Sequence, residues 1–290
     1  MRRLGQILRH PLTTATPSML AMMAFFFVPV AVVVLYSFLT GDLFTVSRPV
    51  TMANYNDVFT IPVHRTLAWN SLIIGTIVAT LTAAIGLPVA YWLHFSAGRW
   101  ATPVLSLIVA SMFAGYLVRI YAWRTVLGTN GVVNSSLERL GLIDEPLGFL
   151  IFSRTSVTIA ELHLMLPFAV VMLFAAIRPI RSDHLEAAED MGAGPLARWR
   201  RVILPLMAAP LATTWTFVFI ISSSDFVTPQ FLGGVRGQLI GTQVNRYFRE
   251  SGDYGRGAAL AIVMILFYVM LWFAIQGALK LARLNRIEWD

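Results

Sequence analysis

The 290-residue sequence contains no cysteine, and Asp, Glu, Lys and Arg together make up only 13% of it. The absence of cysteine excludes disulfide bonds, thiolate metal sites and cysteine nucleophiles. Charge this sparse, combined with 57% hydrophobic residues, excludes an ordinary soluble domain and a disordered or collagen-like chain. We therefore expect a membrane protein, in which the lipid bilayer surrounds much of the apolar surface.

Motifs for enzyme chemistry are also missing. No G-x-x-x-x-G-K-[ST] run is present, so the sequence lacks the backbone cradle and the lysine that hold nucleotide phosphates. The five histidines are scattered without metal-ligand spacing, and neither H-E-x-x-H nor G-x-S-x-G occurs. We predict that the chain is not an enzyme and carries no metal or cofactor of its own.

Long apolar runs are the main feature of the sequence. A membrane-spanning helix needs about 20 mostly apolar residues. Six segments meet this length, at residues 17–39, 69–94, 101–124, 155–178, 206–227 and 257–280. No repeat of 20 to 50 residues and no linker-like tract separates them, so we expect one all-α integral membrane domain with six transmembrane helices.

The positive charges indicate the orientation. An even number of spans places both termini on one side of the membrane. Lys and Arg are enriched in the two termini, the short loop at Arg99 and the central segment 179–205, which places these parts in the cytoplasm. The net charge of +7 is spread over loops without basic runs, so anionic lipid headgroups are the expected partner rather than nucleic acid.

The central segment contains the one long charge-dense stretch, HLEAAEDMGAGPLARWRRVILP, at residues 184–205. Asp183 followed three residues later by Glu186 has the capping-box spacing, which predicts the start of a helix. Gly192 and Gly194 suit the end of that helix, and Pro195 suits the first position of a second one. We expect a helical hairpin, which is either a passive connector or a docking element with small residues at its contact face.

This hairpin carries a family resemblance. The residues that carry the resemblance are Glu186, Ala187, Ala188, Gly192, Leu204 and Pro205. Their spacing resembles the EAA signature of the MetI-like membrane permeases of bacterial ABC importers, with Val202 where that family usually has Ile. The resemblance implies that these residues form a coupling helix seated in a cleft of a separate cytoplasmic ATPase subunit, which binds the ATP.

A second resemblance narrows the branch. Residues 119–146, 225–241 and the Gly-Ala-Ala at 257–259 look like permeases of the spermidine/putrescine importer type, the B or H subunit. DYGRGAA at 253–259 departs from relatives that read Trp-Pro before Gly-Ala-Ala. The resemblance implies a bacterial inner-membrane complex of two permeases, an ATPase dimer and a periplasmic solute-binding protein. It favours a second permease that is distinct in sequence from this chain.

The family fold implies a division of the chain. We expect a cytoplasmic tail at 1–16, a first transmembrane helix at 17–39 and a cytoplasmic tail at 281–290. Between them, residues 66–280 form the permease core, with the coupling loop at 179–205.

Charged residues inside the predicted spans are candidates for function, because such residues are costly in lipid and usually face a cavity or each other. Arg119, Glu161 and Asp225 all fall near the outer third of their spans at about 1.5 Å of rise per residue. One hypothesis is that Glu161 and Asp225, with Tyr121 and Trp123, line the pathway of a cationic solute. The alternative is an ion pair of Arg119 with either carboxylate that only holds helices together.

The predicted function is import of a small cationic solute through an ATP-driven transporter, with a polyamine such as spermidine or putrescine as the leading solute. An opine, an amino-acid derivative or another small amine is the alternative within the same family. A carrier driven by an ion gradient is the alternative class, although the paired repeats of many such carriers are not seen. A membrane scaffold is a third interpretation, which leaves the intramembrane charges unexplained.

Overall fold

The computed structural model describes residues 11–42, 45–282 and 284. The predicted cytoplasmic tails, 1–16 and 281–290, lie largely outside these residues. The chain divides into two compact units. Unit 1 comprises Met1–Ile61 and Val244–Leu266, and unit 2 comprises Pro62–Gln243 and Phe267–Asp290, so the boundary crosses the last helix.

Unit 1 is built around the first long helix. Its elements are α2 (Pro11–Ser37), β1 (Leu39–Asp42), β2 (Thr45–Val50), α3 (Ala53–Thr60), the π-helical turn η5 (Tyr247–Ser251) and the first part of α14 (Tyr254–Leu281). The two strands pair antiparallel. Asn54 on α3 donates to the carbonyl oxygens of Ser37 and Leu39, at 3.0 and 2.8 Å. Arg256 on α14 pairs with Asp57 on α3 at 2.7 Å, so side chains fix the short elements to the long helices.

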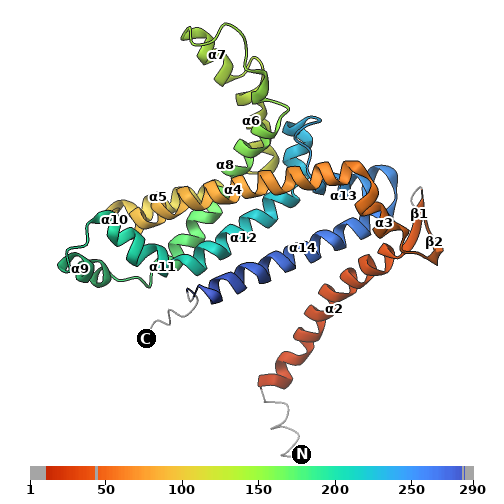
Figure 1. The fold of residues 1–290 in the computed structure, drawn as a ribbon, viewed down its shortest axis with the longest axis horizontal. Coiled ribbons are helices and arrows are strands. Elements are labelled where there is room, and N and C mark those ends of the chain that lie inside the picture. Colours follow the sequence, from red (N-terminus) through yellow and green to blue (C-terminus); the bar gives the residue numbers. More distant parts are fainter. Residues whose placement is uncertain (1–10, 43–44, 283, 285–290) are drawn as a thin grey trace, which may run out of the picture. The chain divides into compact units, whose positions relative to one another are not determined.

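Unit 2 is a helical bundle. Its elements are α4 (Pro62–Phe95), η1 (Gly98–Trp100), α5 (Ala101–Met112), α6 (Tyr116–Leu127), α7 (Val132–Arg139), η2 (Gly148–Leu150), α8 (Arg154–Ile177), α9 (Ser182–Asp190), α10 (Pro195–Arg198), η3 (Trp199–Ile203), α11 (Leu204–Leu206), α12 (Ala208–Ser224), η4 (Pro229–Gly233), the first part of α13 (Ile240–Arg246) and the end of α14. Helices α4, α8 and α12 contact one another and form its centre, and α6 and α7 project from it (Figure 1).

Small residues let the central helices of unit 2 approach closely. A Cβ atom added to Gly75 on α4 would lie 2.8 Å from the Cβ of Ser223 on α12. A Cβ atom added to Gly86 would lie 3.2 Å from Leu173 on α8. Around these contacts Ile74, Val157 and Phe219 are buried in one apolar core. Helix packing in lipid depends on such close contacts because lipid tails remove most of the hydrophobic drive between helices.

The third predicted span, 101–124, is not one straight helix. It is divided into α5 and α6, and the helical segments on either side of the break are bent by 93°. Gly115 lies at the break with ψ 135°, an extended value that stops the helical hydrogen-bond pattern just before Tyr116. This break was not predicted, because residues 111–118 around it are all apolar or small and fit one continuous span.

The fifth predicted span, 206–227, is also different in the structure. It begins at Ala208, after a bend of 68° from the segment Pro195–Leu206, and it ends at Ser224. Pro210 explains the bend, because its ring lacks an N–H group and collides with the carbonyl four residues earlier, at Leu206. The end at Ser224 follows from the extended backbone of Asp225.

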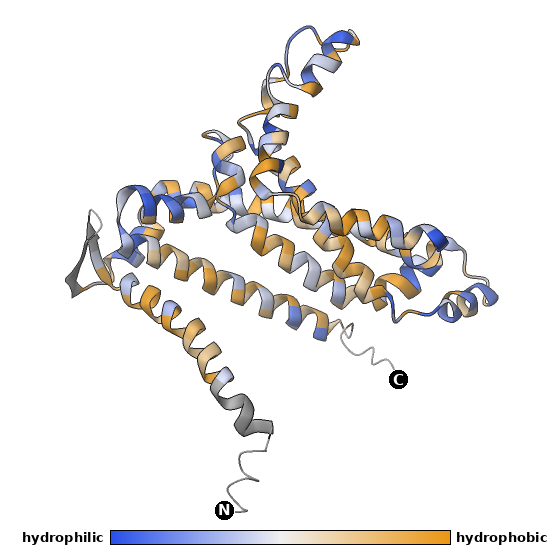
Figure 2. Ribbon diagram, turned by 180° about the vertical axis from the view of Figure 1, so that it is seen from behind, coloured by the Kyte–Doolittle hydropathy of each residue, from blue (hydrophilic) through white to orange (hydrophobic). Residues whose placement is uncertain are grey.

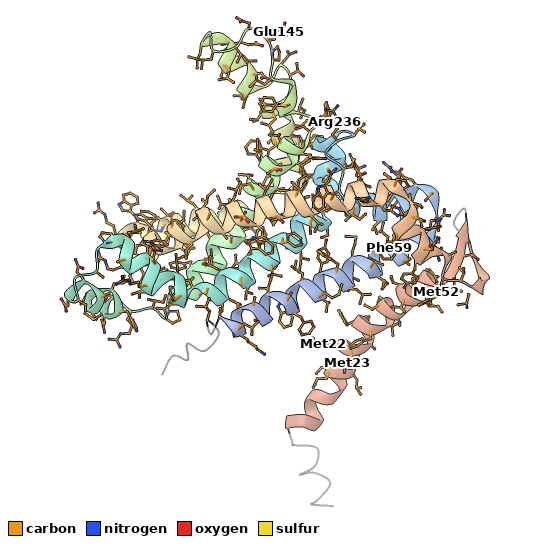
Figure 3. All side chains as sticks on the ribbon, in the orientation of Figure 1. Met22, Met23, Met52, Phe59, Glu145 and Arg236 are labelled. Carbon is orange, nitrogen blue, oxygen red and sulfur yellow. The ribbon has the colours of Figure 1, made fainter. Side chains whose placement is uncertain are left out.

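The described residues contain four helices long and apolar enough to cross a membrane, or up to six if each bent pair counts as one span. The four are Ser18–Ser37, Pro62–Phe95, Arg154–Ile177 and Tyr254–Leu281. Figure 2 shows these helices in mainly hydrophobic colours, whereas α9 is mainly hydrophilic. Large apolar side chains of α2, including Met22 and Met23 in Figure 3, are exposed as expected for lipid contact.

Candidate substrate pathway and coupling hairpin

The predicted hairpin is present as α9, α10, η3 and α11, over residues 182–206. Gly192 has φ +81°, the left-handed conformation that ends α9, and Pro195 begins α10. The predicted capping box is wrong. Helix α9 begins at Ser182 with Arg181 as its N-cap residue, two residues earlier than expected, and it has no side-chain cap. The carboxylate of Asp183 pairs with Arg181 at 2.7 Å, so it is not the helix cap.

The hairpin has an inner and an outer face. Ala188 is buried with Leu185, and Ile203 is completely buried. Glu186, Ala187 and Gly192 are exposed, and the structure offers a side chain at Gly192 open space. Two of the predicted docking positions in the second half, Leu204 and Pro205, are exposed and half-buried, respectively. The EAA-like residues therefore divide: Ala188 packs inward, whereas Glu186 and Ala187 face away from unit 2.

Sequence reasoning missed two apolar side chains on the outer face. Met191 is 82% exposed and Leu196 is 72% exposed, which is unusual for large apolar residues in a polar hairpin. A hollow of about 600 Å³ lies beside Leu196 and is lined also by Gly194, Ala197 and Arg200. This face combines apolar, small and charged groups without a covering element of unit 2. The only feature of the sequence that indicates this exposure is that Met191 and Leu196 do not fit a helical period that would bury both side chains.

Asp225 lies at the end of α12, where the chain leaves the bundle for η4. Its carboxylate accepts hydrogen bonds from the amides of Val227 at 3.0 Å and Thr228 at 2.9 Å. The hydroxyl of Tyr116, the first residue of α6, donates to the same carboxylate at 2.9 Å. Tyr116 is also 2.9 Å from the hydroxyl of Thr228. These contacts fix the turn after α12 and connect it to the start of α6.

Glu161, two turns into α8, is completely buried. Its polar neighbours are Asp225, Thr228 and Ser222, but neither carboxylate oxygen has a partner with hydrogen-bond geometry. The hydroxyl of Ser222 is equally buried and unpartnered. Tyr116, Glu161, Ser222, Asp225 and Thr228 are called the polar cluster below. The structure thus brings the two predicted carboxylates together, as their estimated depth in the membrane suggested.

The other predicted pathway residues lie outside the polar cluster. Over the residues described, no ion pair joins Arg119 to either carboxylate, and its Nε atom is buried without a partner. Arg119 interacts instead with His163, whose ring is 5.5 Å from the ring of Trp123. The Tyr121 ring is half-exposed and lies 5.3 Å from Phe231. The alternative of a structural Arg119–carboxylate pair is therefore wrong in this conformation.

Tyr116 and Thr228 were missed by the sequence interpretation. They are about 110 residues apart in sequence, and they meet only because the break at Gly115 turns α6 toward the end of α12. Of the three serines before Asp225, only Ser223 bonds to another helix. Ser223 bonds to Tyr268 at 2.9 Å and Ser224 to the carbonyl of Ile220 at 2.6 Å, so only Ser222 keeps a free hydroxyl.

Comparison with known proteins identifies the family. No family model matches the chain. The spermidine/putrescine transport system permease protein PotB of Haemophilus influenzae is 31% identical over 263 residues, which cover 90% of this chain and 91% of the relative. This chain belongs to the PotB family of ABC transporter permeases. PotB of Escherichia coli is 30% identical to it over 86% of this chain and 92% of its own length.

Solved structures agree on the fold. The permease resembles a chain in the crystal structure of a bacterial alginate ABC transporter in complex with an alginate-pentasaccharide-bound periplasmic protein. The TM-score is 0.77 at 15% sequence identity, over 94% of both chains. The permease is thus a multi-pass membrane protein with an ABC importer fold, and its family consists of transport proteins rather than enzymes.

Proposed function

We propose that the chain is the transmembrane subunit of an ATP-driven importer that carries a small cationic solute from the periplasm to the cytoplasm. A polyamine such as spermidine or putrescine is the leading solute. The observation that carries this proposal is the relative named for spermidine/putrescine transport, which matches nearly the whole length of both chains. The polar cluster supports a cation, because it contains two carboxylates and no cationic side chain.

In this proposal, each bent helix pair counts as one span. The six spans then leave both termini and the hairpin on the cytoplasmic side. The proposed pathway residues are those predicted from the sequence, Arg119, Tyr121, Trp123, Glu161 and Asp225. Over the residues described, Arg119 makes no ion pair with either carboxylate, and its charge acts on His163 instead.

The proposed energy source is a separate ATPase dimer that binds and hydrolyses the ATP. The absence of a phosphate-binding loop in this chain supports a separate subunit. The exposed face of the hairpin supports a docking role, because Ala187, Met191 and Leu196 have no covering element in unit 2. When the ATPase pair closes, the hairpins of the two permeases move together, and this movement opens the spans toward the periplasm.

The remaining proposed partners are a second, distinct permease and a periplasmic solute-binding protein. The proposed docking surface for the binding protein is formed by the loops at 130–146 and 229–241 of unit 2. Glu145 lies near the far end of the α6–α7 projection and Arg236 in the loop after η4, and both are labelled in Figure 3. Both side chains are exposed, as a docking surface requires.

The first experiment is reconstitution of the purified complex in proteoliposomes with the binding protein outside and ATP inside. We expect uptake of labelled spermidine or putrescine that stops when ATP is omitted. Uptake that follows an ion gradient without ATP would identify a secondary carrier. Competition by unlabelled amines, opines and amino-acid derivatives would rank the solutes, and preferred uptake of a solute without an ammonium group would contradict the cationic assignment.

A second experiment tests the hairpin. The native chain has no cysteine, so Ala187→Cys provides a single thiol on the outer face and Ala188→Cys a matched thiol on the inner face. A thiol-to-amine crosslinker should connect Ala187→Cys to the ATPase subunit in intact membranes. Ala188→Cys should give little product. Equal crosslinking at both positions, or none at Ala187→Cys, contradicts the proposed docking geometry.

A further inference from the structure

The two carboxylates of the polar cluster have different surroundings. Asp225 accepts from two backbone amides and from the hydroxyl of Tyr116. Hydrogen bonds from three donors satisfy most of the acceptor capacity of a carboxylate. Asp225 is therefore occupied within the protein, and its position at the junction of α12 and η4 explains why.

Glu161 has the opposite character. It is completely buried, and neither oxygen has a partner with hydrogen-bond geometry, although Ser222, Thr228 and Asp225 are its polar neighbours. Buried carboxyl groups without a partner are rare, because burial removes the hydrogen bonds that water would supply. The hydroxyl of Ser222 is the second unpartnered buried oxygen next to it. Two neighbouring side chains on α8 and α12 thus leave acceptors unused at the same place.

A protonated primary amine fits this pair of groups. Its ammonium group has three N–H donors and no acceptor, as in the side chain of lysine. Glu161 offers two carboxylate oxygens and Ser222 offers one hydroxyl oxygen. A hydrogen bond from a charged donor to a carboxylate is stronger than one between neutral groups. The carboxylate of Asp225, the second one in the cluster, adds to the local attraction for a cation.

We propose that Glu161 and Ser222 form the subsite that binds the ammonium group of the solute during its passage, and that Asp225 is a positioning residue. This inference rests on the proposed function, which supplies the cationic solute. Asp225 holds the turn at η4 and, through Tyr116, the start of α6, so that both stay in place over Glu161. Tyr121 and Trp123, whose rings contact Phe231 and His163, are not part of the subsite.

The subsite is closed in this structure, since Glu161 has no exposed surface. The neighbouring helix breaks provide a way to open it. Tyr116 and Asp225 are partly exposed, and each lies directly at a break, after Gly115 and after Ser224. In the proposal, entry of the solute requires the Tyr116–Asp225 contact at these two positions to open.

The test measures solute transported per ATP hydrolysed in proteoliposomes that contain the complete transporter, with labelled putrescine at saturating concentration. Glu161→Gln keeps the shape of the side chain but loses the charge, and we expect this ratio to fall roughly tenfold to a hundredfold. Ser222→Ala should lower it about threefold. A defect that is only structural would lower uptake and ATP hydrolysis together and leave the ratio unchanged.

Matched controls are available on the same helix and in the same cluster. Ser224→Ala removes a hydroxyl that already bonds to its own helix, and the ratio should equal that of the wild type. Asp225→Asn should lower uptake and ATP hydrolysis in parallel, as expected for a positioning residue. A larger fall of the ratio in Asp225→Asn than in Glu161→Gln would reverse the two roles and overturn the inference.

The outcomes separate the two proposals. If the wild-type complex transports neither putrescine nor spermidine, the proposed solute class fails. If it transports putrescine and Glu161→Gln has the wild-type ratio, only the subsite fails. Should Glu161→Gln not assemble, Ser222→Ala decides, because its hydroxyl has no partner to lose, and an unchanged ratio would then overturn the subsite.

Discussion

The polar cluster and the hairpin are both rich in polar groups, but these groups find partners in different ways. In the cluster, Tyr116, Asp225 and Thr228 bond to one another and to backbone amides, and only Glu161 and Ser222 keep unused acceptors. In the hairpin, most polar side chains reach solvent, and the unusual feature is exposed apolar surface at Met191 and Leu196. In each region the unmet group matches the proposed ligand: a cation for the cluster inside the membrane and a protein surface for the hairpin outside it.

The largest contrast is expected from glycine substitutions. A Cβ atom at Gly241 would collide with the backbone carbonyl of Ser224 and approach that of Asp225, whereas one at Gly194 in the hairpin meets nothing. Gly241→Ala should therefore destabilise the permease by about 3 kcal/mol, because neither backbone can yield without moving the cluster. Gly194→Ala should change little. Thermal unfolding of the purified complex measures both, and equal melting temperatures would show that the cluster is more adaptable than its packing suggests.

A smaller effect is expected from removing a cluster carboxylate that has partners. Asp225→Ala leaves the amides of Val227 and Thr228 and the hydroxyl of Tyr116 without their acceptor, at a cost of about 2 kcal/mol. Asp190→Ala, at the exposed end of α9, is the matched hairpin change and should be nearly neutral. The measurement is the melting temperature of each variant, and an equal loss in both would remove the distinction between the two regions.

The third prediction uses neighbouring alanines of the hairpin. Ala188→Leu overfills the inner face and should destabilise the permease by about 1 to 3 kcal/mol. The side chain at position 187 points outward, so Ala187→Leu should leave the melting temperature of the permease unchanged. The larger side chain should instead obstruct docking, and the ATPase subunit should be lost during purification. Copurification and melting curves together check this. If Ala187→Leu keeps the ATPase and full transport, the outer face is not the docking surface.

The smallest effect is expected at the Glu189–Arg198 pair, which joins the two halves of the hairpin at 2.7 Å. Glu189 is 64% exposed, so water and salt screen the pair. Glu189→Gln should cost at most about 0.5 kcal/mol, and the difference should disappear at high salt. A loss comparable to that of Asp225→Ala would mean that the hairpin is held by its charges, contrary to the comparison.

The helical hairpin illustrates how much local chemistry the sequence carries. Gly192 at the end of α9 and Pro195 at the start of α10 were predictable because each residue type favours one backbone conformation. The capping box failed because α9 begins at Ser182, which places Asp183 inside the first turn, where its carboxylate pairs with Arg181. Which alanine of the pair points inward was also not predictable, since both are small and apolar and only packing against unit 2 distinguishes them.

The breaks at Gly115 and Met207 show the limit for the long helices. Apolar runs of about 20 residues predict that a segment stays in the membrane, but not that it stays straight. Pro210 offered a reason for the second bend, whereas the first depends on a glycine in an otherwise ordinary apolar run. Tyr116 and Thr228 could not be predicted as partners of Asp225 because their meeting depends on that bend.

By itself, the sequence determined the membrane setting, the approximate positions of the apolar helices, the hairpin and the family resemblance, because hydrophobicity, turn residues and motif spacing are properties of the chain read locally. Only the tertiary structure decided which carboxylate is satisfied and which is not, and which hairpin residues face outward. A hydrogen bond or a buried face depends on what other parts of the chain bring to the same place, and two acidic residues 64 positions apart look alike until their neighbours are known.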